Sequence, residues 1–332
     1  MEAVEKVEKW KSKWERFWFE EVPSEIFGLV RIAIGAAGLV SLVGSTPVEM
    51  FWSPDGIAPL PGGGLGLRRY VLESGLGVVA GWTMFLALFT ALACMSVGLF
   101  TSSAVIVSFL GTVVQAHWNP LPLTSGHGVL MAALFCLIWA DCGARLSIDE
   151  LRQPRARSRT PPKPPAPPGN QGARQPVWPL RLIQVQVAII YWTSGLYKLL
   201  GPMWRDGSAV HYTTAQNVFG RVFHVYPFPA GFDWVLTLLT YTTVLWEISF
   251  PFMLLNRITR RVALATGIAM HLGIWAMMEV GPFTWMMLAS YVAFLDPEKV
   301  RRALIIRTST QPPPDTAPAA MNQAATGSTP AA

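Results

Sequence analysis

Eight long apolar segments take up most of this chain of 332 residues and constrain its fold more than any other feature. A helix needs about 20 apolar residues to cross the roughly 30 Å hydrocarbon core of a bilayer, and most of the segments approach that length. They comprise residues 24–46, 76–98, 103–118, 126–143, 181–201, 233–256, 262–280 and 282–296. The sequence therefore predicts an all-α membrane bundle of about eight transmembrane helices.

The composition excludes an ordinary soluble domain. Hydrophobic residues make up 52% of the chain and charged residues 14%, whereas soluble domains carry about 25% charged residues. The net charge of +6 is interpreted as a topology signal, so membrane lipid is the expected partner and nucleic acid is not. Cys94, Cys136 and Cys142 lie in or beside apolar segments, and the histidines lack metal-ligand spacing. Neither a disulfide framework nor a metal site is expected.

Basic residues predict the orientation. If all eight segments cross and the N-terminus is cytoplasmic, nineteen Lys and Arg residues fall in cytoplasmic regions and four in outer loops. The nineteen are Lys6, Lys9, Lys11, Lys13, Arg16, Arg145, Arg152, Arg155, Arg157, Arg159, Lys163, Arg174, Arg257, Arg260, Arg261, Lys299, Arg301, Arg302 and Arg307; the four are Arg68, Arg69, Arg205 and Arg221. This excess places both termini in the cytoplasm. The expected location is an inner (cytoplasmic) membrane.

The polar segments complete the predicted organisation. Residues 1–21 place apolar side chains at helical spacing between charges, which is typical of an amphipathic helix at the membrane interface. Residues 22–300 form the membrane domain, within which residues 146–178 are a cytoplasmic linker rich in Pro and Arg. Residues 301–332 are expected to be a disordered cytoplasmic tail.

In the fifth apolar segment, Lys198 shares one helical face with polar and small residues. That face carries Gln184, Tyr191, Ser194 and Gly195, so it is expected to meet protein or a cavity rather than lipid. Two interpretations of the lysine remain open at this stage. It either extends to the outer membrane surface or is a desolvated lysine that acts as a base.

Several stretches together resemble the membrane domain of vitamin K-dependent gamma-carboxylase, which bacterial HTTM (horizontally transferred transmembrane) proteins share. The stretches are IIYWTSGLYKLLGPMWRDG (189–207), SGHGVLMAALFCLIWADCGARLSID (125–149), HLGIWAMMEVGPFTWMMLASYVAFLDP (271–297), LVRIAIG (29–35) and FWSPDGIAPLP (51–61). The resemblance covers roughly residues 20–300. The motif that contains the lysine is its most specific part.

The resemblance implies roles for individual residues. Lys198 matches the lysine implicated as the base that deprotonates vitamin K hydroquinone. His127 matches a histidine near the quinone and is expected to be the polar neighbour of Lys198 in the catalytic site. His271 matches another membrane-embedded histidine, and with Tyr191 and Trp204 it is expected to contact the cofactor. The resemblance thus implies a reduced quinone as cofactor and a carboxylase-like reaction.

The sequence also departs from the carboxylase. Gly126 stands where that family has Asn before its histidine, and the large extramembrane substrate domain of the carboxylase does not follow the last apolar segment. This chain is therefore not expected to carboxylate glutamate by itself. The alternative hypothesis is a non-enzymatic membrane factor for the maturation or export of a secreted peptide, as suggested by HTTM relatives in sporulation-delaying toxin systems. A secreted peptide or a separate substrate-binding protein is the implied partner.

Two further charges lie inside apolar segments. Arg31 lies roughly 10 Å and Glu247 roughly 13 Å from the cytoplasmic side, at 1.5 Å per helical residue. Each charge alone is costly in a bilayer. The matching depths predict a structural ion pair between Arg31 and Glu247 that closes the inner side of the bundle.

Overall fold

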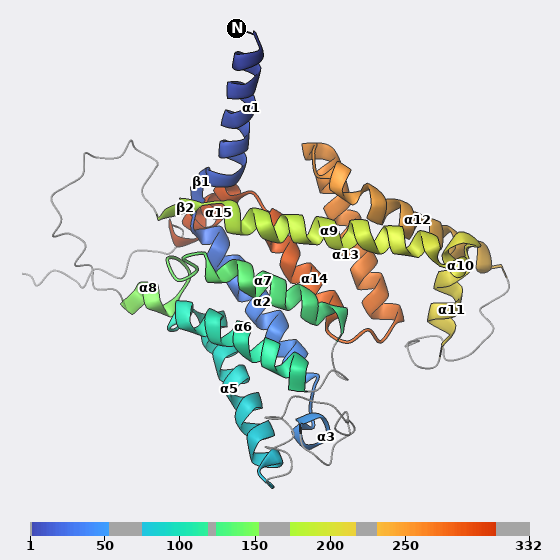
Figure 1. The fold of residues 1–332 in the computed structure, drawn as a ribbon, viewed down its shortest axis with the longest axis horizontal. Helices are drawn as coiled ribbons and strands as arrows, with labels where there is room; N and C mark the ends of the chain where they lie inside the picture. The colour runs from blue at the N-terminus through green and yellow to red at the C-terminus, as the bar shows by residue number, and fades with distance from the viewer. Residues whose placement is uncertain (1, 53–74, 119–123, 153–172, 217–230, 310–332) are drawn as a thin grey trace, which may run out of the picture.

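The computed structural model describes residues 2–52, 75–118, 124–152, 173–216 and 231–309, which are mostly helical (Figure 1). The helices are α1 (Glu2–Phe19), α2 (Glu25–Val43), α3 (Val48–Trp52), α5 (Gly77–Val97), α6 (Thr101–Trp118), α7 (Ser125–Ile138), α8 (Ile148–Arg152), α9 (Trp178–Leu200), α10 (Pro202–Arg205), α11 (Ala209–Ala215), α12 (Asp233–Met253), α13 (Arg257–Met277), α14 (Phe283–Tyr291), the 3₁₀ helix η2 (Val292–Phe294) and α15 (Pro297–Ser309). Two short strands, β1 (Glu21–Pro23) and β2 (Arg174–Pro176), are the departure from the expected all-α fold.

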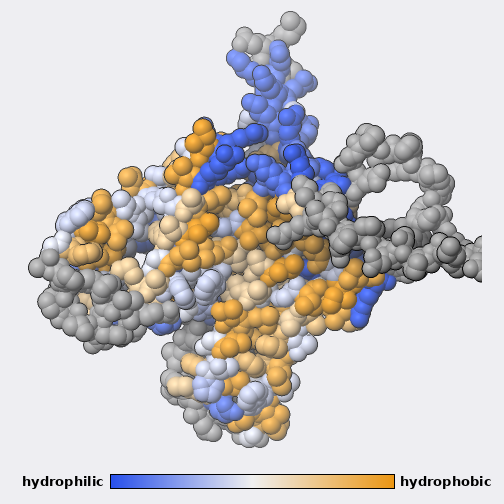
Figure 2. All heavy atoms as spheres, turned by 180° about the vertical axis from the view of Figure 1, so that it is seen from behind, coloured by the Kyte–Doolittle hydropathy of each residue, from blue (hydrophilic) through white to orange (hydrophobic). Residues whose placement is uncertain are grey.

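Each of the eight apolar segments contains a helix, as predicted. Among the described residues, three helices, α2, α5 and α12, are long and apolar enough to cross a membrane by length and composition. Helix α7 has 14 residues and α14 has 9, both fewer than the roughly 20 of a full crossing. The surface of the bundle is apolar over much of the face in Figure 2, while hydrophilic residues gather on α1 and around its base.

Helix α2 lies at the centre of the bundle. Ile26, Phe27, Val30 and Ile34 are fully buried, and α2 packs against α5, α7, α14 and α15. Glycines let the neighbours come close: a Cβ at Gly35 would lie 2.3 Å from the Ser96 hydroxyl on α5. Small residues at such crossings are typical of helix packing in membranes. Helices α5 and α6 lie on one side of this centre, and α9, α12 and α13 lie on the other (Figure 1).

One end of the bundle carries β1, β2, α8 and α15, and we refer to it as the β-sheet end. The strands pair antiparallel, with Val22 opposite Gln175. Ion pairs join segments that are distant in sequence, at Glu25–Arg145 (3.3 Å) and Arg174–Glu298 (2.9 Å). The strand pairing ties the residues before α2 to those before α9, and the ion pairs tie α2 to the segment after α7 and β2 to α15.

The predicted linker and the expected disordered tail are both partly ordered in the structure. The linker 146–178 begins with α8 and ends with β2, because both of its ends pair with the bundle. The expected disordered tail begins inside α15, and Arg301 is buried beside Glu25. The middle of the linker, residues 153–172, and residues 310–332 lie outside the described residues.

Candidate functional site

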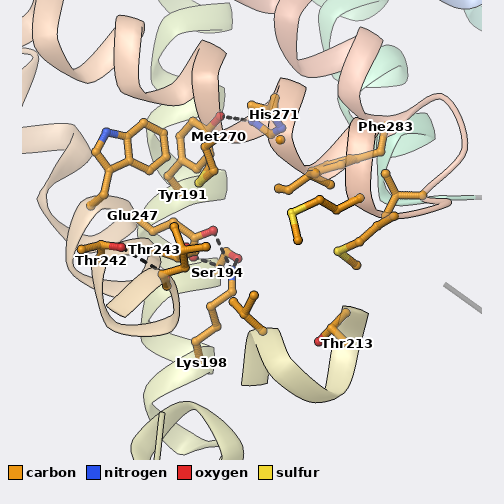
Figure 3. A pocket seen from close by; sticks show the side chains of 18 of the residues that line it. Tyr191, Ser194, Lys198, Thr213, Thr242, Thr243, Glu247, Met270, His271 and Phe283 are labelled. Atoms are coloured by element: carbon orange, nitrogen blue, oxygen red, sulfur yellow. Dashed lines mark hydrogen bonds and ion pairs between the residues drawn. The ribbon is translucent and has the colours of Figure 1, made fainter. Parts of the chain in front are cut away.

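A cavity of about 620 Å³ lies among α9, α11, α12 and α13 (Figure 3). Helices α10 and α11 lie at the end of the bundle opposite the β-sheet end (Figure 1). The walls of the cavity are mainly apolar, with Ile190, Leu239, Ile274, Met277 and Phe283 among the lining residues. Polar lining groups comprise Ser125, Tyr191, Ser194, Lys198, Thr213, Thr214, Thr242, Thr243, Glu247, Thr266 and His271. The site combines an apolar volume with a few converging polar groups, which is the usual composition of a small-molecule pocket.

An ion pair between Lys198 and Glu247 lies in the wall of this cavity. The Lys198 Nζ atom lies 2.6 and 2.5 Å from the two carboxylate oxygens of Glu247 and donates to the Ser194 hydroxyl at 2.8 Å. The side chains are 19% and 7% exposed. Helical side chains lean toward the N-terminus, so Lys198 turns back over Ser194 and into the bundle. Its Nζ also lies 5.0 Å from the centre of the Trp204 ring.

This pairing depends on the close approach of α9 and α12. Gly195 faces α12, where a Cβ atom would lie 2.8 Å from Ile248 and 3.1 Å from the Cβ of Glu247. A larger residue at this position would hold the helices apart. The glycine therefore lets the carboxylate of Glu247 reach the lysine one turn further along α9.

The predicted ion pair between Arg31 and Glu247 is wrong. Glu247 pairs with Lys198, and Arg31 instead donates from Nη2 to the carbonyl oxygen of Leu146. The depth estimate measured each charge from the cytoplasmic end of its own apolar segment, and so treated these ends as lying at one level. In the structure α12 extends past the end of α9 and packs there against α10 and α11, which brings Glu247 level with Lys198.

A second polar group joins three helices beside the ion pair. The Tyr191 hydroxyl on α9 lies 2.6 Å from Nε2 of His271 on α13 and 2.6 Å from the Tyr291 hydroxyl on α14. Tyr191 is 2% and His271 1% exposed. The Tyr191 ring also packs edge-on against Trp246, with ring centres 4.7 Å apart. Burying a polar group in apolar surroundings costs free energy unless the group is hydrogen-bonded. The two hydrogen bonds of Tyr191 therefore hold the three side chains in place.

The hydrogen-bond chain leaves one ring nitrogen of His271 available. Nδ1 of His271 is buried and has no hydrogen-bond partner among the described residues. Tyr191 has a single proton to donate. If it donates to His271, Nδ1 carries the imidazole proton; if it donates to Tyr291, Nδ1 is a free acceptor. In either arrangement a cavity-lining histidine retains one unused hydrogen-bonding position.

His127 lies elsewhere, contrary to the prediction that it is the polar neighbour of Lys198. Its Nδ1 accepts a hydrogen bond from the backbone N–H of Thr124 at 3.0 Å, and its Nε2 lies 3.2 Å from the Ser41 hydroxyl on α2. It is 3% exposed and is not among the residues that line the cavity. Both ring nitrogens are thus used to hold the start of α7 against α2.

The structure brings together four of the predicted site residues: Lys198, Tyr191, Trp204 and His271 all line the cavity. Sequence reasoning missed Glu247 as the partner of Lys198 and did not consider Tyr291. A sequence signal existed for Glu247, because an acidic residue inside an apolar segment needs a counter-charge. Identifying Lys198 as the partner of Glu247 requires the relative placement of α9 and α12, which the sequence does not give.

The apolar helices around a largely apolar cavity define a helical protein of the membrane class with an internal cavity. The HTTM domain model matches residues 82–298, which include every residue that lines the cavity, and the chain belongs to the HTTM family. No curated protein and no solved structure matches the chain.

Proposed function

We propose that this HTTM protein binds a quinone or another isoprenoid-tailed lipid in the cavity, with the polar head of the ligand beside Lys198 and Glu247. One observation carries the proposal: a buried ion pair lies in the wall of an apolar cavity of about 620 Å³. That volume falls in the range of about 300–1,000 Å³ typical of small-molecule sites. Ionisable residues inside a membrane are expensive and commonly functional.

The proposed topology is eight crossing helices with both termini in the cytoplasm of a bacterium, in the inner membrane. The distribution of basic residues and the helix found in each apolar segment support it. In this topology the β-sheet end is cytoplasmic and the cavity lies in the outer half of the bilayer. The short helices α7 and α14 pack against each other and against α2, so protein rather than lipid covers much of their surface.

The side chains of the cavity fit a reduced quinone. Ile274, Met277 and Phe283 provide apolar contacts for a ring and an isoprenoid tail. Nδ1 of His271 has no hydrogen-bond partner among the described residues, and a ring oxygen would supply one. A second ring oxygen beside Lys198 would replace one acceptor of its ammonium, whose three protons are directed at Ser194 and the two carboxylate oxygens of Glu247. When bound, such a group would supply an acidic hydroxyl and the reducing power for a carboxylase-like reaction.

The ion pair defines how Lys198 would act as the base. With its proton on the ammonium, Lys198 is a donor and cannot accept another proton. Transfer of that proton to the Glu247 carboxylate, at 2.5 Å, leaves a neutral amine and a neutral acid. The amine is then able to accept a proton from a ligand hydroxyl, and the resulting ammonium stabilises the oxyanion.

A Lys198→Arg variant tests the base. Arginine keeps the charge but does not release its proton, so the variant should remain folded and bind lipid. It should fail to oxidise added reduced menaquinone under oxygen and carbon dioxide, as followed by chromatography. Equal turnover by both proteins, or none by the unmodified protein, would overturn the base assignment.

Lipid extraction from the purified protein tests ligand binding itself. Mass spectrometry should detect a prenyl quinone or an isoprenoid lipid in near-stoichiometric amount. A Gly273→Leu variant should reduce binding by roughly tenfold or more, because overfilling a packed site costs about 1–3 kcal/mol. Gly273 lines the cavity, and a Cβ there meets no atom within 4 Å.

Gly128→Leu is the matched control. Gly128 is also a helical glycine with nothing within 4 Å of a Cβ, but it lies on the exposed face of α7 and does not line the cavity. Its lipid content should equal that of the unmodified protein. Equal lipid content in the Gly273→Leu protein, or a secreted peptide in place of lipid, would refute the proposed ligand. The peptide result would favour a maturation or export factor.

A further inference from the structure

Helix α1 exposes a row of large apolar side chains. Val7 and Trp10 are each 64% exposed, Trp14 is 49% and Phe17 is 41% exposed. The rings of Trp10 and Trp14 stack with centres 5.5 Å apart. At 100° per residue these side chains lie on one side of the helix. We refer to these four side chains as the apolar stripe. An apolar stripe of this length is unusual on a surface that contacts only water.

The C-terminal end of α1 is attached to the bundle. The Arg181 guanidinium on α9 lies 4.7 Å from the centre of the Phe17 ring, and its Nε donates to the Phe17 carbonyl oxygen. Two residues after Phe19, β1 pairs with β2. Helix α1 then extends away from the bundle, crosswise to α9 (Figure 1). With 18 residues at 1.5 Å each, it is about 27 Å long.

Basic residues surround the point of attachment. Arg181 lies in the first turn of α9, and Arg257, Arg260 and Arg261 lie in the first turns of α13. Arg260 is close enough to Arg181 for their positive charges to repel each other, and Glu20 provides a negative charge beside Arg181. One acidic residue does not balance the four arginines of this region, so further negative charge from outside the chain would be favourable. At the end of a membrane bundle, anionic lipid headgroups are such a source.

Helix α1 continues this positive charge along one flank. In helical projection Lys6, Lys9, Lys13 and Arg16 form a strip that borders the Phe17 and Trp10 side of the apolar stripe. Tryptophan prefers the boundary between headgroups and acyl chains. Long basic side chains beside it are able to reach lipid phosphates while their stems cover apolar surface.

We propose that α1 lies along the anionic headgroup layer of the bilayer at the β-sheet end, with its apolar stripe toward the acyl chains and its basic flank toward lipid phosphates. The occupant of the exposed stripe is thus a phospholipid surface. The contact at Phe17 sets the direction in which the helix leaves the bundle. The inference does not depend on the ligand of the cavity.

Spin labels on the two sides of α1 test the orientation in the full-length protein. Val7→Cys places a label on the apolar stripe, and Ser12→Cys places one nearly opposite. Both are made in a background in which the free cysteines Cys94, Cys136 and Cys142 are replaced by alanine. The protein is reconstituted in phosphatidylcholine nanodiscs with and without phosphatidylglycerol.

The Val7 label should collide more with oxygen, which concentrates in the bilayer, and the Ser12 label more with a water-soluble nickel chelate. Adding phosphatidylglycerol should shift the Val7 label deeper. Water exposure at both positions would overturn the membrane contact. Shielding of the Val7 label from both reagents would instead indicate a protein partner. An unchanged depth on adding phosphatidylglycerol would overturn the preference for anionic lipid.

Discussion

Replacing Glu247 with glutamine tests whether the ion pair with Lys198 holds α9 and α12 together. Glutamine keeps the size of the side chain and one acceptor oxygen, so the change removes charge without creating a cavity. It leaves the Lys198 ammonium, 19% exposed, without its counter-ion. Removing one partner of a buried ion pair costs about 3–5 kcal/mol. Because Lys198 retains some exposure, we expect a loss of about 3 kcal/mol.

The assay is equilibrium unfolding in mixed micelles with increasing sodium dodecyl sulfate, followed by circular dichroism. Lys198→Met combined with Glu247→Leu should recover most of the loss, because an apolar pair of similar size replaces a desolvated charge pair. The double mutant should therefore lose clearly less than the sum of the single mutants. Function would be lost in that protein, but stability would not.

An exposed ion pair in the same chain provides the control. Lys11 and Glu15 on α1 lie 4.0 Å apart with side chains 72% and 58% exposed. Glu15→Gln should change the unfolding free energy by less than about 0.5 kcal/mol, as is usual for surface pairs. If Glu247→Gln changes stability no more than Glu15→Gln, or if the cycle is strictly additive, the ion pair does not stabilise the fold.

Three further changes probe other parts of this arrangement. Arg31→Ala and Glu247→Gln should be additive to within about 0.5 kcal/mol in the same unfolding assay, because the two residues share no partner; a clear coupling would restore the rejected pairing. Gly195→Leu should cost about 1–3 kcal/mol and weaken the Lys198–Glu247 coupling in a repeated cycle, since it forces α9 away from α12; an unchanged coupling would contradict the role given to this glycine. His127→Ala should lower the unfolding free energy by about 1 kcal/mol, comparable to the loss of a helix cap, and leave the lipid content unchanged. Loss of lipid without loss of stability would indicate that His127 acts at the ligand site.

Helix formation was predictable because it depends on local sequence. The apolar length of each segment and its lack of charge are enough to favour a helix in lipid, where every backbone group must be satisfied internally. The shared face of Tyr191, Ser194 and Lys198 was equally predictable, because 3.6 residues per turn align positions three and four apart. The structure bears out both features.

Partners across helices were decided by the tertiary structure. Glu247 pairs with Lys198 because α12 is displaced along α9, where it packs against α10 and α11, and because Gly195 lets the two helices approach closely. His127 is withdrawn from the cavity because Ser41 on α2 and the backbone of Thr124 use its two nitrogens. Such choices depend on the axial offsets between neighbouring helices. The periodicity of a single segment determines which residues share a face of the helix. It carries no information about the position of that helix along the axis of its neighbour.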